Sequence, residues 1–127
     1  MTTIAVVEDN ADNRLLLQAI LDGHYDLVEY ENGVDALAGL AAALPDLVLL
    51  DISLPGMDGN EILARIRADT ALRRLPVIAL TAHAMSGDRE KYLAAGFNDY
   101  ITKPIVDETI LLAAIERWLL TTRTGSF

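Results

Sequence analysis

Apolar residues in this chain form two kinds of segment: short continuous runs, and longer stretches in which they recur at helical spacing. Three short runs, residues 4–7, 47–50 and 77–80, are uninterrupted and rich in branched side chains. Such runs are typical of parallel strands that are buried on both faces of a sheet. Two others, residues 27–30 and 100–102, mix polar and apolar positions, which suits strands at the edges.

The longer stretches predict five helices, at about residues 11–22, 33–44, 58–67, 86–95 and 107–121. Asp58 with Glu61 three positions later resembles a capping box at the start of the third. Gly96 suits a left-handed cap at the end of the fourth. We expect residues 1–121 to form one domain and residues 122–127 a flexible tail.

Five strands, each followed by a helix, predict an α/β fold with a doubly wound parallel sheet and helices on both faces. Right-handed crossovers leave few possible topologies for such a chain. In all of them the carboxyl ends of the strands line one edge of the sheet, where ligands bind. The groups at the strand ends therefore decide the chemistry.

Composition narrows the class of protein. The chain has 127 residues, 52% of them hydrophobic and 23% charged, which is enough apolar material for one core. The absence of cysteine excludes disulfides and thiolate metal sites. A net charge of -9 disfavours binding to nucleic acid or an anionic membrane. Because the sequence has neither a long apolar run nor a signal peptide, we expect a cytoplasmic protein.

Chemically active residues follow four of the predicted strands. Glu8 and Asp9 follow the first, Asp51 ends the third, Thr81 follows the fourth and Lys103 follows the fifth. Each alone has an ordinary interpretation, as a helix cap or a surface residue. Three carboxylates at one edge would raise one another's pKa values unless a cation held them. A hard divalent ion such as Mg²⁺, with oxygen ligands and a phosphate partner, fits this set best.

The same residues carry a resemblance to a known family. Five motifs contribute to it: Glu8-Asp9, Asp51, the loop at residues 54–59, Thr81-Ala82 and Lys103-Pro104. In this order they resemble the receiver domains of response regulators, the CheY-like family, over a match from Ile4 to about Leu120. The resemblance implies a flavodoxin-like strand order of 2-1-3-4-5. It also implies a signalling switch in a phosphorelay, rather than an enzyme, that supports its own phosphorylation and dephosphorylation.

The resemblance assigns the acidic residues their roles. Asp51 resembles the phosphoacceptor, whose carboxylate becomes an aspartyl phosphate. Asp9 resembles a direct ligand of Mg²⁺, for which Mn²⁺ can substitute, and Glu8 a ligand that acts through a water molecule. The backbone carbonyl of Ser53 is implied as the third protein ligand.

Other residues are implied to bind and sense the phosphoryl group. Thr81 and Lys103 resemble its hydroxyl and ammonium partners, and Lys103-Pro104 resembles the family's cis peptide. Tyr100 resembles the aromatic that turns inward with the threonine and changes the surface around the fourth helix, fifth strand and fifth helix; alternatively, it is a half-buried edge-strand aromatic. Ser53 and His83 are implied to tune the lifetime of the phosphate, although His83 also suits an uninvolved surface position.

The implied partners are a sensor histidine kinase or a histidine phosphotransfer protein, and a downstream protein target. The implied docking surface comprises Asn10, Asn13, Arg14, Leu15, Pro104 and Ile105. We expect a monomer, or a weak dimer that depends on phosphorylation. The length leaves no room for an output domain, so we expect a stand-alone receiver or one excised from a hybrid histidine kinase.

Three rival classes share parts of this pattern. A flavodoxin-like binding module needs Ser, Thr or Gly in its first loop, where this chain has an acidic loop that would repel a phosphate. A phosphatase of the haloacid dehalogenase type needs a second acid two residues after the nucleophile, and Ser53 stands there. A pseudo-receiver that serves only as an interaction domain would lack one of the five site groups, and all five are present.

Overall fold

The computed structural model describes residues 2–82, 88–103, 105 and 107–124. Five strands alternate with five helices, as the sequence predicts. The strands are β1 (Thr3–Val7), β2 (Asp26–Tyr30), β3 (Leu47–Asp51), β4 (Val77–Thr81) and β5 (Asp99–Thr102). The helices are α1 (Ala11–Leu21), α2 (Gly33–Ala42), α3 (Gly59–Ala68), α4 (Asp88–Ala95) and α5 (Glu108–Thr124).

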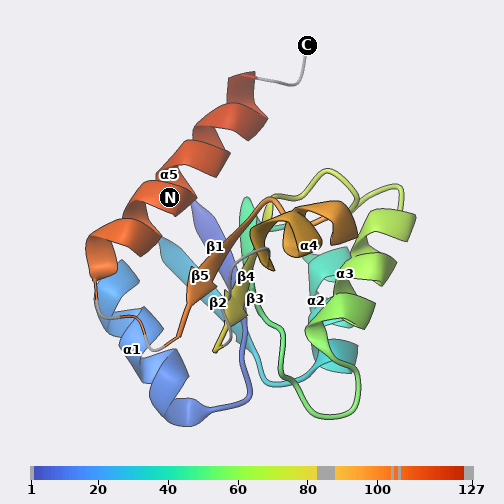
Figure 1. The fold of residues 1–127 in the computed structure, drawn as a ribbon, viewed down its shortest axis with the longest axis horizontal. Helices are drawn as coiled ribbons and strands as arrows, with labels where there is room; N and C mark the ends of the chain where they lie inside the picture. Colours follow the sequence, from blue (N-terminus) through green and yellow to red (C-terminus); the bar gives the residue numbers. More distant parts are fainter. Residues whose placement is uncertain (1, 83–87, 104, 106, 125–127) are drawn as a thin grey trace.

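The strands form one parallel sheet in the order β2-β1-β3-β4-β5, which confirms the implied topology. Helices α1 and α5 cover one face of the sheet, and α2, α3 and α4 cover the other (Figure 1). The residues of β3 and β4 are buried throughout, whereas β2 and β5 lie at the edges, as expected.

Alternation along the strands divides the core into two clusters, one on each face. In β3, Leu47 and Leu49 belong to the cluster beneath α1 and α5, whereas Val48 and Leu50 belong to the cluster beneath α2, α3 and α4. Helices cover both faces of this parallel sheet, so the side chains on both faces of a central strand are buried. This explains why the central strands are continuous apolar runs.

Side-chain caps fix where the helices begin. Asn10, Asn32 and Asp58 each accept a hydrogen bond from the backbone N–H three residues later, at α1, α2 and α3 respectively. The predicted cap at Asp58 is thereby confirmed. Gly96 follows α4 with a φ of 113°, which confirms the predicted left-handed position.

The last helix is longer than expected. It continues to Thr124, through three residues that we assigned to a tail. The sequence contains no glycine or proline between the core of this helix and Gly125, so nothing in the chain stops it at residue 121. In the portion that the structure describes, none of the helices combines the length and the apolar character that a membrane span requires.

Candidate functional site

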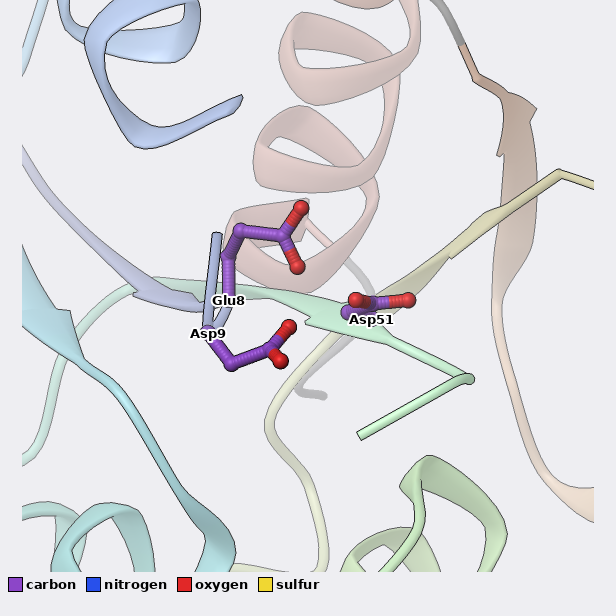
Figure 2. Close-up of side chains that lie close together, drawn as sticks. All are labelled: Glu8, Asp9 and Asp51. Carbon is purple, nitrogen blue, oxygen red and sulfur yellow. The ribbon is translucent and has the colours of Figure 1, made fainter. Parts of the chain in front are cut away.

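Three carboxylates converge at the carboxyl ends of β1 and β3. Glu8 and Asp9 follow β1, and Asp51 is the last residue of β3. Their side chains point toward one another (Figure 2), and one oxygen of each lies within 4.8 Å of the others. Glu8 and Asp51 are buried and Asp9 is exposed, so the cluster opens to solvent on the side of Asp9. The structure thus brings together the acids that the sequence placed at separate strand ends.

Lys103 is the cation beside this cluster. Its Nζ lies 3.1 Å from Oδ1 of Asp51 and 3.4 Å from Oε1 of Glu8. The backbone N–H of Lys103 donates to the carbonyl of Thr81, which ties the end of β5 to the end of β4. The ammonium of Lys103 thus points into the acidic cluster. One ammonium faces two buried carboxylates, so the buried part of the site keeps an excess of negative charge when both are ionised.

Glu8 is fully buried beside a second carboxylate. Its burial and the adjacent Asp51 carboxylate raise the pKa of Glu8 to about 7. Among the described residues, its buried Oε2 has no hydrogen-bond partner. Asp51 cannot supply one while both groups are ionised, because neither carries a proton to donate. A proton or a metal ion would satisfy this oxygen.

The pKa of Asp51, unlike that of Glu8, is lowered. Burial disfavours its charged form, but the neighbouring Glu8, the Ser53 N–H and Lys103 together lower the pKa of Asp51 below its usual 3.8. The Ser53 N–H donates to Oδ1 of Asp51 over 2.9 Å. The two acids therefore titrate as a pair, in which the pKa of Glu8 is raised and that of Asp51 is lowered.

Two residues of α1 hold Glu8 in place. The side-chain amide of Asn13 donates to Oε1 of Glu8, and Nη1 of Arg14 donates to its backbone carbonyl over 2.8 Å. Arg14 also pairs with Glu29 and Glu31 on the neighbouring edge of the sheet. The sequence assigned both α1 residues only to docking. Both residues lie in the first turn of α1, shortly after Glu8 and Asp9, and this position could have indicated that they contact Glu8.

The loop after Asp51 passes unusually close to α3. A Cβ atom on Gly59 would lie 2.5 Å from the backbone oxygen of Asp51 and 2.7 Å from Cα of Ile52, a distance that backbone atoms cannot tolerate. The N–H of Gly59 also donates to the carbonyl of Ile52. Glycine at the start of α3 therefore allows the helix to pack directly behind Asp51.

Thr81 is buried at the end of β4 and faces a residue that the sequence analysis did not single out. Its Oγ1 lies 3.0 Å from the hydroxyl of Tyr92 in α4. The ring of Tyr92 in turn contacts the ring of Tyr100 in β5, with 5.6 Å between the centroids. Tyr100 is half-buried, which agrees with either of its two interpretations.

The remaining predicted residues are placed only in part. Asn10 caps α1, Leu15 is 60% exposed and Ile105 is half-buried. His83 and Pro104, with the expected cis peptide before Pro104, lie outside the described residues.

Comparison with known proteins agrees with this arrangement. The chain is 40% identical over 119 residues to the sensor protein GacS of Pseudomonas syringae pv. syringae, which is 91% of this chain but only 13% of GacS. It is 39% identical over 104 residues to the polar-differentiation response regulator DivK of Brucella anthropi, which is 81% of this chain and 85% of DivK. The chain thus spans a small part of one relative and most of another.

A solved structure with the same fold is the receiver domain of the sensor histidine kinase PA1611 from Pseudomonas aeruginosa PAO1, which has a magnesium ion coordinated in its active site cleft. The two structures share a TM-score of 0.83 and 38% identity, over 93% of this chain and 97% of that one. The model of the response regulator receiver domain family matches residues 4–116. This chain therefore belongs to the response regulator receiver domains, the signalling switches of two-component phosphorelays.

Proposed function

We propose that this chain accepts a phosphoryl group on Asp51 in a reaction that depends on Mg²⁺. The observation that carries the proposal is the convergence of Glu8, Asp9 and Asp51 beside the ammonium of Lys103. Phosphoryl transfer needs little covalent chemistry from a protein, and it depends on positioning and on neutralising charge. A carboxylate nucleophile beside an ammonium and a cation site meets both needs.

The donor set fits a hard divalent cation. Asp9 and Asp51 would hold the ion directly, the backbone carbonyl of Ser53 would complete the protein ligands, and Glu8 would act through a water molecule. The buried Oε2 of Glu8 supports this assignment, because the described residues offer it no hydrogen-bond donor. When bound, Mg²⁺ supplies positive charge against the incoming phosphate, and Mn²⁺ has similar oxygen preferences.

The nucleophile in this reaction is a carboxylate oxygen of Asp51. A new bond forms between that oxygen and the phosphorus of a phosphohistidine, while the bond from phosphorus to the imidazole nitrogen breaks and the imidazole leaves. Asp51 is prepared for this step because its lowered pKa keeps it ionised at neutral pH. Lys103 and Thr81 then bind the phosphoryl oxygens. Hydrolysis by water reverses the switch, and the family resemblance implies that Ser53 and His83 tune the lifetime of the phosphate.

The proposed readout is a change in the surface formed by α4, β5 and α5. Thr81 moves toward the phosphoryl group and Tyr100 turns with it, so that a charge change at Asp51 alters the packing at an edge of the sheet. A downstream protein would recognise the altered surface. Ring contact between Tyr92 and Tyr100 supports such a connection between α4 and β5.

We further propose that the donor is a histidine kinase or a histidine phosphotransfer protein that docks on α1 and the loop after β5. Leu15 and Ile105 are the most useful probes of this surface. Arg14 is a poorer probe because it also holds the backbone of Glu8.

The docking surface is tested by phosphotransfer from a phosphorylated histidine phosphotransfer domain to Leu15→Asp and Ile105→Asp. We expect both variants to accept phosphate from the phosphotransfer domain more slowly than the wild type does, and from acetyl phosphate at the wild-type rate. Leu44→Asp is the matched control, since Leu44 is 62% exposed and precedes β3 at the opposite end of the sheet. Equal losses with both donors would refute the docking role.

The main proposal is tested by intact-mass analysis after incubation with acetyl phosphate. We expect a phosphate adduct on the wild type with Mg²⁺, and none without the metal or on Asp51→Asn. An adduct on Asp51→Asn would assign the phosphate to another residue. An unchanged mass in every sample would leave a pseudo-receiver that acts only through binding.

A further inference from the structure

Tyr92 is a buried polar side chain that the proposed chemistry does not use. Its hydroxyl lies 3.0 Å from Oγ1 of Thr81, and the two residues are only 7% and 2% exposed. Its ring contacts the rings of Phe97, at a centroid distance of 6.0 Å, and Tyr100, at 5.6 Å. The aromatic contacts fix the direction of the hydroxyl, so the hydrogen bond to Thr81 is built into the packing of α4 on the sheet.

The alternation of the strands shows where Thr81 is directed. Val77 and Ala79 of β4 belong to the cluster beneath α2, α3 and α4, and Thr81 follows them at the same spacing. Asp51 follows Leu47 and Leu49, which belong to the cluster beneath α1 and α5. The hydroxyl of Thr81 is therefore bonded on one face of the sheet, while the phosphoacceptor stands in register with the other face.

We propose that Tyr92 is a positioning residue that holds Thr81 in its unphosphorylated orientation and opposes its movement toward Asp51. This inference rests on the proposed function, in which Thr81 binds a phosphoryl oxygen. Turning the Thr81 hydroxyl toward the phosphoryl group breaks its hydrogen bond to Tyr92, and that loss offsets part of the new interaction.

The same hydrogen bond links Thr81 to the readout surface. The ring of Tyr92 packs on the ring of Tyr100, so releasing the Tyr92 hydroxyl changes the packing of both aromatic rings. Movement of Thr81 thereby changes the side-chain packing of α4, through Tyr92, and of β5, through Tyr100. Tyr92 sets how strongly the unphosphorylated arrangement is favoured, and Tyr100 reports the change.

The test compares the wild type with Tyr92→Phe, which keeps the ring and removes the hydroxyl. The probe is beryllofluoride, a mimic of the phosphoryl group, added with Mg²⁺ and followed by the amide NMR signals. We expect Tyr92→Phe to bind beryllofluoride about 2- to 10-fold more tightly, the range for one neutral hydrogen bond. Its affinity for Mg²⁺ alone should not change, because Tyr92 touches none of the proposed ligands. Tyr92→Leu is a second variant without the hydroxyl and should shift binding in the same direction.

Two controls make the result specific. Tyr30→Phe removes a hydroxyl from another tyrosine that packs on the same core cluster, and it should bind beryllofluoride as the wild type does. In a Thr81→Ala background, Tyr92→Phe should have a smaller effect, because the hydrogen bond between the two hydroxyls is already gone.

The outcomes separate this inference from the function on which it rests. A wild type that does not bind beryllofluoride with Mg²⁺ would refute the proposed function itself. A wild type that binds, with Tyr92→Phe equal or weaker, would overturn only the role of Tyr92. An effect of equal size in Tyr30→Phe, or one that is undiminished without the Thr81 hydroxyl, would overturn it as well.

Discussion

Replacing Glu8 with glutamine should stabilise the protein in the absence of metal. In the wild type above neutral pH, Glu8 and Asp51 place two negative charges in a buried site with one ammonium between them. Glutamine keeps the shape of the side chain and resembles protonated Glu8. Its amide oxygen can still accept from Asn13, and its N–H groups can donate to the Asp51 carboxylate. The variant therefore removes a repulsion and replaces the unpartnered Oε2 of Glu8 with a group that can donate a hydrogen bond.

The size of the effect follows from the pKa of Glu8. A rise from 4.5 to about 7 corresponds to about 3 kcal/mol of folding free energy at 1.36 kcal/mol per pH unit. The side chains relax and water enters from the side of Asp9, which reduces this value. We expect Glu8→Gln to raise the unfolding free energy by about 1–3 kcal/mol at about pH 8 without metal. Urea unfolding followed by far-UV circular dichroism measures it.

The stability gained by Glu8→Gln should increase as the pH rises. Because the folded-state pKa of Glu8 is raised, the folded protein binds a proton more tightly than the unfolded chain between about pH 4.5 and 7. Wild-type stability therefore falls as the pH rises through this window, and the advantage of Glu8→Gln grows. Near pH 4.5 the two proteins should converge. The lowered pKa of Asp51 acts below its usual value of 3.8, outside this window.

Magnesium should cancel or reverse the difference. An ion present at 100 times its dissociation constant stabilises the wild type by about 2.7 kcal/mol, and the variant gains less because it has lost an ionised acid. Glu116→Gln, an exposed site on α5, is the control and should change little in either condition. The reasoning would be refuted by a Glu8→Gln protein that is less stable than the wild type without metal at about pH 8.

Three further predictions concern other parts of the fold. Gly59→Ala should lower the unfolding free energy by about 1–3 kcal/mol and slow labelling by acetyl phosphate, because the added Cβ meets the backbone of Asp51. Urea unfolding and mass analysis measure the two effects, and unchanged values would contradict the close approach. Arg67 donates two hydrogen bonds to the carbonyl of Gly96 at the end of α4. Arg67→Met should therefore lower the free energy of unfolding in urea by about 2–4 kcal/mol, and a loss below about 1 kcal/mol would be inconsistent with this role. Trp118 lies in α5, outside the acidic cluster, so its fluorescence should respond weakly to Mg²⁺; a large quench would place this helix closer to the metal than we infer.

Much of the fold could be read from local patterns. The uninterrupted run at residues 47–50 predicted a central strand because both faces of that strand are covered by helices. Asp58 and Gly96 marked helix ends through interactions with the backbone a few residues away. The acids Glu8 and Asp51 could be brought together without a structure, since parallel strands present their carboxyl ends at one edge.

What the sequence could not determine is how side chains from distant segments face one another. The hydrogen bond between Thr81 and Tyr92, and the support of Glu8 by Asn13 and Arg14, depend on how α4 and α1 are rotated on the sheet. No local periodicity encodes that rotation, because it results from packing whole apolar faces against the strands. Local chemistry therefore determined which groups reach the edge of the sheet. Tertiary packing decided which of them touch, and with that the charge state of Glu8 and the partner of Thr81.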